Sequence, residues 1–288
     1  MEDTQRDQAA YDVVGRYKQD EVNGFTPALI DRMLDAAQLA GAESVLDAMA
    51  GDGNLTQRLY AYCRTRGLPA PRITALELSP VQSEFARGSV GPLGASVLCG
   101  DVLAMTDSAT GYVLPGNVFD RVLIKSASHE IPCRLQPDLY RSIFRVLRPG
   151  GIFVNVGFLF DDPTERDEAR EIARVKDRLA GMEAAVRNRH FLMREEFYGF
   201  LRDAGFDAIG AAESIQYNIR SQMVAEYYWP PERRESADLE LQSAEVRAVT
   251  LRKNGRVRFE GSGSILQFPG EITTARKPLT GESKRVMF

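Results

Sequence analysis

The sequence has few of the residues that build metal clusters or disulfide frameworks. It contains two histidines and three cysteines, and Cys63, Cys99 and Cys133 stand far apart with no Cys-x-x-Cys pair. Neither a disulfide framework nor a structural zinc motif is indicated, so we expect no bound metal. Scattered cysteines in odd number are typical of a reducing compartment, and we therefore expect a cytoplasmic location.

Long apolar runs and an excess of basic charge are also missing. No apolar stretch approaches the roughly 18 residues that a membrane helix needs, and the first residues are polar and acidic, unlike a signal peptide. The formal net charge is −4, whereas nucleic-acid-binding domains normally carry a basic face. We expect no membrane anchor and no nucleic-acid partner, and the sequence leaves a homodimer open.

What remains is an ordinary globular composition, with 44% hydrophobic and 26% charged residues in a chain of 288, enough to bury a large core. Strand-like and helix-like segments alternate, which predicts an α/β fold. We expect a doubly wound, mainly parallel Rossmann-like sheet with helices on both faces. The expected strands are residues 44–48, 72–78, 95–99, 119–124 and 151–158, and the expected helices are residues 55–66, 80–89, 137–147, 163–187 and 193–206.

The flanking segments differ in character from this alternating part. Thr26 and Pro27 are typical of a helix start. Residues 244–259 alternate around Asn254-Gly255, which predicts a β-hairpin. The expected organisation is an N-terminal helical lid over 1–40, a core over 41–215, C-terminal strands with a β-rich and helical insertion over 216–278, and a tail over 279–288. The third part would complete the sheet and form a substrate pocket or an oligomer interface.

The segment VLDAMAGDGN, residues 45–54, carries the most information. It indicates a buried strand, a tight glycine turn and the start of a helix. Gly51 and Gly53 permit positive φ and let a ligand approach the backbone closely. The open N–H groups of the following helix can meet a polar ligand group. This arrangement is where nucleotide-like cofactors bind in α/β proteins.

Carboxylates end the next two expected strands. Glu77 follows ITAL and can accept hydrogen bonds from both hydroxyls of a ribose. Asp101 follows SVLCG and can accept from the exocyclic amine of an adenine, with Val102 and Leu103 packing on the ring. The fourth strand ends in a polar cluster from Lys125 onward. Parallel strands bring all these ends to one sheet edge.

Together these segments resemble the class I S-adenosylmethionine-dependent methyltransferases, of the type that acts on small molecules. The resemblance covers residues 43–210. VLDAMAGDG is similar to the family's first motif, usually Asp-x-Gly-x-Gly-x-Gly, and ALELSP, GDVLAM and FDRVLIKSASHEIP are similar to the next three. LRPGGIFVNVGF resembles the strand after these motifs, and LMREEFYGFLRDAGFD the helix and turn before the sixth strand.

The resemblance implies S-adenosyl-L-methionine as cofactor and assigns roles to matching residues. The first-motif residues would surround the methionine part, Glu77 would hold the ribose, and Asp101 would hold the adenine. Lys125 and Ser126 would lie beside the sulfonium. The full expected cofactor set is Tyr17, Asp47, Ala48, Met49, Gly51, Gly53, Asn54, Glu77, Leu78, Asp101, Val102, Lys125 and Ser126.

The first motif departs from the family pattern. Met49 stands where the family usually has its first glycine, so its side chain must pack on the cofactor or point away from it. Asn54 is also uncommon there and is expected to cap the next helix. A dinucleotide dehydrogenase is the competing interpretation, but Thr56 occupies the place of that fingerprint's third glycine.

Methyl transfer requires an aligned nucleophile, exclusion of water and, for some acceptors, a base. His129 follows the fourth strand, and an unperturbed histidine pKa near 6.5 suits a general base. The other interpretation is that His129 only orients a loop. We expect His129 to be catalytic and to contact substrate, together with Tyr11, His190 and Tyr228.

The acceptor class is predicted mostly from missing motifs. KSAS follows the fourth strand in place of the Asp/Asn-Pro-Pro-aromatic pattern that grips planar nitrogens. This disfavours DNA adenine and protein glutamine as acceptors. We expect a small molecule methylated on oxygen or carbon rather than nitrogen, in the biosynthesis of specialised metabolites. A cyclase or lyase that uses the same cofactor without methyl transfer remains an alternative, as does a noncatalytic binding protein.

Overall fold

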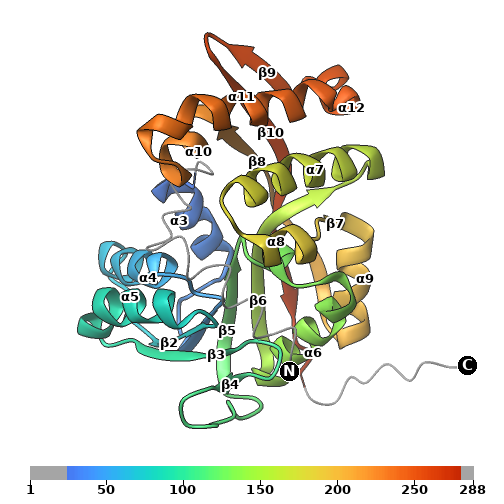
Figure 1. Cartoon of the computed structure of the whole chain (residues 1–288). Coiled ribbons are helices and arrows are strands. Elements are labelled where there is room, and N and C mark those ends of the chain that lie inside the picture. The colour runs from blue at the N-terminus through green and yellow to red at the C-terminus, as the bar shows by residue number, and fades with distance from the viewer. Residues whose placement is uncertain (1–24, 280–288) are drawn as a thin grey trace, which may run out of the picture.

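A computed structural model of the chain describes residues 25–279, and a mixed sheet forms the centre of this part (Figure 1). The strand order is β4-β3-β2-β1-β5-β6-β10-β8, with β7 paired to β6 and β9 to β10. The strands are β1 Ser44–Ala48, β2 Arg72–Glu77, β3 Ser96–Asp101, β4 Thr106–Asp107, β5 Phe119–Lys125, β6 Leu147–Phe160, β7 Leu192–Met193, β8 Asp207–Arg220, β9 Val257–Glu260 and β10 Gly263–Arg276.

The central strands are parallel, as the alternating sequence predicts. β1 pairs in parallel with β2 and β5, β2 with β3, and β5 with β6. β10 runs antiparallel between β6 and β8. The carboxyl ends of β1, β2, β3 and β5 therefore lie at one edge of the sheet, where ligands of open α/β sheets bind.

Helices cover both faces of the sheet, with α3, α4 and α5 on one side and α6 and α9 on the other (Figure 1). In β5, Val122 and Ile124 pack in the cluster of α6 and α9, while Leu123 packs in the cluster of α3 and α4. The helices are α3 Pro27–Ala36, α4 Asn54–Thr65, α5 Pro80–Val90, α6 Gln136–Val146, α7 Pro163–Leu179, α8 Glu183–Asn188, α9 Arg194–Ala204, α10 Ser221–Tyr228, α11 Pro231–Arg247 and α12 Val249–Lys253, with 3₁₀ turns at Gly91–Leu93, Ser128–Glu130 and Cys133–Leu135.

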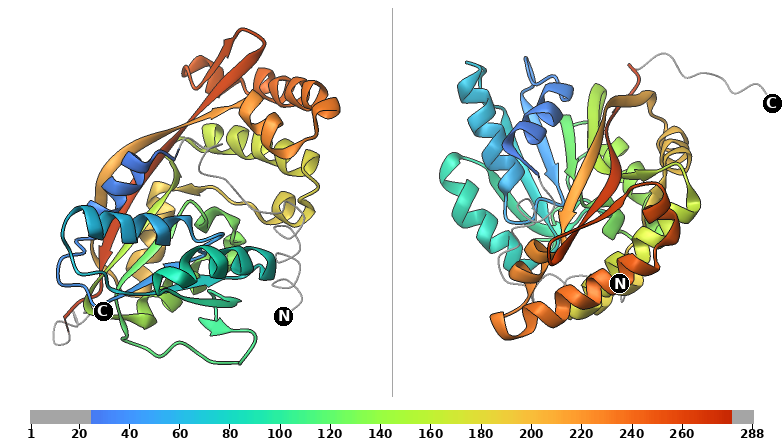
Figure 2. Two further views of the ribbon diagram at one scale, coloured as in Figure 1. Left: turned by 90° about the vertical axis from the view of Figure 1, so that its left-hand side faces the viewer. Right: turned by 90° about the horizontal axis from the view of Figure 1, so that it is seen from above.

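A second layer, which we call the cap, lies over the end of the sheet where β6 finishes. It consists of residues 163–188, which follow β6, and residues 221–260, which lie between β8 and β10. Figure 2 shows α7, α10 and α11 crossing above the strands. Among residues 25–279, no helix combines the length and apolarity needed to cross a membrane.

Helix boundaries follow the local signals at several places. The side chain of Thr26 accepts a hydrogen bond from the backbone N–H of Leu29 and caps α3, as expected. Gly205 ends α9 with a φ of 101°, which glycine adopts readily. Most of the expected lid, residues 1–24, and the tail residues 280–288 lie outside the described residues. β8 crosses the expected boundary at 215/216.

Two sequence-based expectations are wrong. Residues 163–187 do not form one helix, because Gly181 adopts a φ of 76° and separates α7 from α8. The segment 244–259 is not a hairpin that turns at Asn254-Gly255. Up to Lys253 it belongs to α11 and α12, which Ala248 separates, and Ala244, Ala248 and Leu251 are buried at helical spacing. Only β9 at its end is a strand, and it pairs with β10.

A buried ion pair joins the two helices of the first cap segment. The guanidinium of Arg189, after α8, donates to both carboxylate oxygens of Asp177 in α7, from Nε at 2.5 Å and Nη2 at 3.0 Å. The Nζ atom of Lys176 lies 2.8 Å from Asp177 Oδ1. Burial alone would raise the pKa of Asp177, but Arg189 and Lys176 lower it to about 2. The pair therefore stays ionised inside the cap.

We predict that Asp177→Asn destabilises the protein by about 3–5 kcal/mol, because it leaves the charge of Arg189 buried and unpaired. Urea unfolding followed by circular dichroism measures the change. The matched control is Asp167→Asn, which removes an exposed carboxylate from α7 and should cost less than about 1 kcal/mol. Equal effects of the two variants would contradict a structural role for the buried pair.

Candidate functional site

The glycine turn after β1 begins at a buried carboxylate. Asp47 is 1% exposed, and its Oδ2 accepts a hydrogen bond of 2.7 Å from the hydroxyl of Thr56 in α4. Burial raises the pKa of Asp47 to about 6, although Thr56 and the positive charge of Lys125 oppose the rise. The Asp47 carboxylate is thus held at the base of the turn, close to a cation.

The turn itself contains three left-handed residues: Met49, Gly51 and Gly53, with φ angles of 62°, 56° and 86°. A Cβ atom on Gly51 would meet no other atom within 4 Å, so space is open beside this backbone. A Cβ on Gly53 would lie only 3.0 Å from the Val90 side chain, so glycine is needed there for packing against α5. This is a turn shaped for close approach by a ligand.

Met49 packs against the core cluster around Leu46 and Leu76 while keeping its left-handed backbone. Such a conformation costs a non-glycine residue roughly 1–2 kcal/mol, and strain of this kind is concentrated at functional sites. The expected cap at Asn54 is wrong, because Gly53 is the N-cap residue of α4 and no side chain caps this helix.

Glu77, at the end of β2, holds the turn in place. Its Oε2 accepts a 2.8 Å hydrogen bond from the backbone N–H of Gly51, and its Oε1 accepts one of 2.8 Å from the backbone N–H of Ser79. A carboxylate oxygen can accept two hydrogen bonds, so this group can also receive ribose hydroxyls. Leu78 follows it and accepts a hydrogen bond from the thiol of Cys99.

Asp101 and Val102 follow at the end of β3, and Lys125 and Ser126 at the end of β5. Asp101 Oδ1 accepts a 2.8 Å hydrogen bond from the backbone N–H of Leu103, and burial raises the pKa of Asp101. Val102 is buried. Lys125 Nζ lies 5.4 Å from the ring centre of Phe25. Ser126 has a φ of 53°.

The expected cofactor residues within 25–279 thus lie at the ends of neighbouring strands, and we call this group of strand ends the crevice. An open glycine backbone, the Glu77 carboxylate and the buried Asp47 fit the groups of S-adenosylmethionine. Tyr17 lies outside the described residues.

A cavity of about 60 Å³ lies beneath the cap, on the other side of the β5 and β6 strand ends. Two residues expected to contact substrate, His129 and Tyr228, line it. The remaining lining residues were not identified from the sequence, because they come from distant segments with no motif spacing. They are Phe158, Ile172, Ala173, Lys176, Arg189, Phe191, Ile219, Ser221, Val224, Leu241, Glu245, Leu266 and Phe268.

His129 lies at the floor of this cavity. Its ring packs 5.1 Å from that of Phe158 and 5.5 Å from that of Phe191, and only 3% of the residue is exposed. Nδ1 is buried and has no hydrogen-bond partner in the described part of the chain. Burial, with the nearby charges of Arg189 and Lys176, places the pKa of His129 well below its ordinary value. The imidazole is therefore neutral at pH 7.

Aromatic rings separate the cavity from the crevice. Phe158 contacts His129 on one side and Tyr217 on the other, where the ring centres are 4.2 Å apart. Burial raises the pKa of Tyr217, and the nearby Ser126 hydroxyl opposes this rise. Phe158 and Tyr217 therefore connect the cavity to the end of β5, where Ser126 lies. Phe25 packs on the same Tyr217 ring, at 5.2 Å.

The upper part of the cavity contains a second buried acid, Glu245 of α11. Burial raises the pKa of Glu245 to about 7, helped by the negative charge of Asp238 and opposed by the nearby hydroxyl of Ser264. The cavity lining thus combines an apolar majority with a few ionisable groups, Lys176, Arg189 and Glu245.

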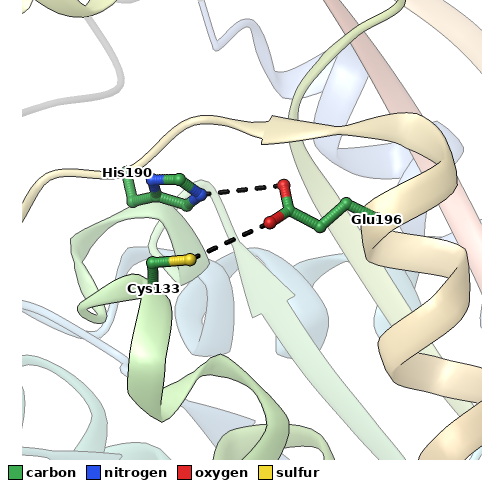
Figure 3. A group of neighbouring side chains, drawn as sticks. All are labelled: Cys133, His190 and Glu196. Carbon is green, nitrogen blue, oxygen red and sulfur yellow. Dashed lines mark hydrogen bonds and ion pairs between the residues drawn. The ribbon is translucent and has the colours of Figure 1, made fainter.

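Two other residues expected to contact substrate are placed elsewhere. Tyr11 lies outside the described residues. His190 does not line the cavity, although its backbone N–H donates a 2.8 Å hydrogen bond to the carbonyl of His129. Its ring points toward Cys133 and Glu196 (Figure 3).

Part of this chain is similar in sequence to known methyltransferases. Residues 45–151 match the family model of a methyltransferase domain. An uncharacterized methyltransferase of Schizosaccharomyces pombe, C70.08c, is 30% identical over 132 residues. That match covers 45% of this chain and 45% of the yeast protein, so the chain spans about half the length of the curated relative that it matches.

Two solved structures share the fold. The YcgJ protein from Bacillus subtilis superposes with a TM-score of 0.67 at 15% identity, covering 86% of this chain and 97% of its own. Geranyl diphosphate C-methyltransferase from Streptomyces coelicolor, solved with S-adenosyl-L-homocysteine, superposes with a TM-score of 0.51 at 14% identity, covering 86% and 75%. Residues 45–151, which carry the glycine turn and the strand ends, are thus similar to a methyltransferase domain, and the sheet has the Rossmann-like fold of class I S-adenosylmethionine-dependent methyltransferases.

Proposed function

We propose that this protein transfers a methyl group from S-adenosylmethionine to a small, largely apolar acceptor that binds beneath the cap. The observation that carries the proposal is the position of His129. It lies three residues after Ser126, at the border between crevice and cavity, with a buried ring nitrogen that has no hydrogen-bond partner within residues 25–279. A buried polar atom of this kind is normally paired, so it suits a hydroxyl brought by a ligand.

The crevice residues would bind and orient the cofactor. When bound, S-adenosylmethionine supplies a methyl group on a cationic sulfur. Asp47, the Gly51 backbone and Met49 would surround its methionine part, Glu77 its ribose and Asp101 its adenine. Lys125 and Ser126 end the neighbouring strand, close to Asp47, and would lie at the reacting end. The other expected residues, Ala48, Gly53, Asn54, Leu78 and Val102, would complete the walls.

The cavity would exclude water and hold the acceptor. Its volume of about 60 Å³ is below the roughly 150 Å³ that encloses a benzene molecule. Acceptor binding therefore requires the cap to move away from the sheet, and its return would seal the reacting groups from solvent. Phenylalanine rings on three strands or loops and Tyr228 on α10 favour a planar or branched apolar body.

His129 would accept a hydrogen bond or a proton from the nucleophile. Its low pKa keeps the imidazole neutral at pH 7, so that one of its two ring nitrogens is free to accept a proton, as a base requires. The same low pKa makes the imidazole a weak base, so the nucleophile must itself be acidic. A phenol, an enol or an activated carbon meets this condition better than an amine, which supports an O- or C-acceptor.

The setting of the reaction is also a proposal. Mostly apolar acceptors of this kind are consistent with biosynthesis of specialised metabolites. Three cysteines without disulfides support a cytoplasmic location, and the acidic net charge disfavours a nucleic-acid substrate. Exposed apolar residues on the second cap segment, Leu239, Val246, Val249 and Phe259, support a homodimer.

Glu77→Gln should weaken S-adenosylmethionine binding by about 1–3 kcal/mol, roughly 5- to 150-fold in Kd, because it removes a charged acceptor of ribose hydroxyls and loosens the glycine turn. Calorimetry with purified protein measures the change. Glu84→Gln in α5, where the exposed carboxylate pairs with Arg87, is the control and should bind normally. Unchanged affinity in Glu77→Gln would refute the ribose assignment.

Cofactor affinity should depend on pH through Asp47. The free protein holds the pKa of Asp47 at about 6, and a cationic amino group beside it would lower that pKa, so binding releases a proton. Below about pH 6 the Kd should rise up to tenfold per pH unit, and above it the Kd should be constant. Asp47→Asn should bind weakly with a flat profile between about pH 5 and pH 8. An equally steep dependence of the Kd on pH in Asp47→Asn would exclude Asp47 as the group that titrates on cofactor binding.

His129→Ala should reduce methyl transfer by about 10²- to 10⁴-fold while leaving the Kd for S-adenosylmethionine within about twofold. A panel of phenols and enols, incubated with radiolabelled S-adenosylmethionine, gives the readout. His129→Gln keeps a hydrogen-bond acceptor and should retain more activity than His129→Ala. Full turnover in His129→Ala would exclude His129 as the group that accepts a hydrogen bond or a proton from the nucleophile. Methylthioadenosine in place of S-adenosylhomocysteine as product would favour the lyase alternative.

A further inference from the structure

We propose that Cys133, His190 and Glu196 form a binding site for a divalent transition-metal cation of the zinc type at the rim of the cap. No such motif is visible in the linear sequence, because the three residues are separated by 57 and 6 positions, from 133 to 190 and from 190 to 196. The fold brings them together (Figure 3).

The spacing of the ligand atoms matches a tetrahedral ion. Cys133 Sγ lies 3.8 Å from Glu196 Oε1, and His190 Nε2 lies 3.7 Å from Glu196 Oε2. All three ligand atoms lie within 4.8 Å of one another. Zinc–ligand bonds of roughly 2.0–2.3 Å at tetrahedral angles separate the ligands by about 3.3–3.8 Å. An ion at the centre therefore needs only small side-chain adjustments.

Each ligand comes from a segment that the fold fixes separately. Cys133 begins the 3₁₀ turn before α6, His190 precedes β7, and Glu196 lies in the first turn of α9. The carboxylate of Glu196 is held near the start of α9, because its Oε2 accepts a hydrogen bond from the backbone N–H of Met193. The backbone of His190 is held by its bond to the carbonyl of His129. The site is thus pre-organised.

The chemistry of the group also favours a metal. A thiolate, an imidazole and a carboxylate are all zinc ligands, and a three-ligand site leaves one position for water. His190 Nε2 is buried and makes no hydrogen bond to any residue of 25–279. Cys133 is exposed, so a cation can reach it. The negative charges of the Cys133 thiolate and the Glu196 carboxylate would balance the charge of the ion. The positive charges of Arg166 and Arg170 near His190 would oppose its binding.

A bound ion would join the loop that carries His129 to α9. Cys133 follows this loop by four residues, and His190 is hydrogen-bonded to it directly. Occupancy would therefore restrain the floor of the cavity from outside, without contacting anything inside it. A ligand that binds only the folded state also stabilises that state.

Metal binding is tested on the full chain, stripped with a chelator and kept reduced. Co²⁺ should bind at one equivalent, giving the visible bands of a tetrahedral ion and a thiolate-to-cobalt charge-transfer band, and Zn²⁺ should displace it. Cys133→Ser should lose the charge-transfer band, and His190→Asn and Glu196→Gln should each weaken Zn²⁺ affinity by about tenfold or more. Cys99→Ser, which keeps all three ligands, should retain the band.

Three results would overturn the proposal: no stoichiometric cobalt spectrum, a charge-transfer band that persists in Cys133→Ser, or one that disappears in Cys99→Ser. Circular dichroism of each variant separates loss of the site from loss of the fold, and the three ligand variants give independent tests. Because the readout needs neither cofactor nor acceptor, a negative result leaves the proposed methyl transfer standing.

Discussion

The hydrogen bonds of the Glu77 carboxylate are the constraint on which the cofactor crevice depends. Through them the end of β2 holds both the glycine turn after β1 and the start of the segment that leads into α5. A left-handed turn containing Met49 is intrinsically strained, and a charged acceptor at its centre offsets that strain. The group that would bind the ribose is therefore also the group that shapes the turn, so cofactor binding and local folding are linked.

The cap provides what the sheet cannot. Strand ends bring Asp47, Glu77 and Asp101 to one edge, but they offer no enclosed space for a second molecule. α7, α10 and α11 cover the cavity, and the buried pair of Asp177 and Arg189 ties α7 to the residue after α8. Phe158 and Tyr217 form the partition between the two compartments. Under the proposed function, a substitution of either ring would change how close an acceptor comes to the sulfonium.

The position of the expected cofactor residues at neighbouring strand ends could be predicted from the sequence because they come in short runs, each directly after an apolar strand. The cavity could not, since its lining runs from His129 to Phe268 without a repeating interval. Residues 244–259 alternate in a way that predicts a hairpin, but Ala244, Ala248 and Leu251 also fit a helical period. Burial of these three residues in the fold favours helix over strand. The proposed metal ligand Cys133 could not be identified from the spacing of the cysteines, because only the fold brings His190 close to it.

The second cap segment leaves the sheet and returns to it at nearly the same point. β8 ends at Arg220, which pairs with Ile265 near the start of β10, so the intervening residues close a loop on adjacent strands. Such an excursion can change in length or sequence while the strand register that supports the crevice stays fixed. The molecule thus consists of a sheet with a fixed strand register and an insertion, residues 221–260, that begins and ends on neighbouring strands. Under the proposed function, a change of this insertion would alter acceptor preference without altering the crevice, which makes α10 to β9 a natural unit for grafting between proteins of this fold.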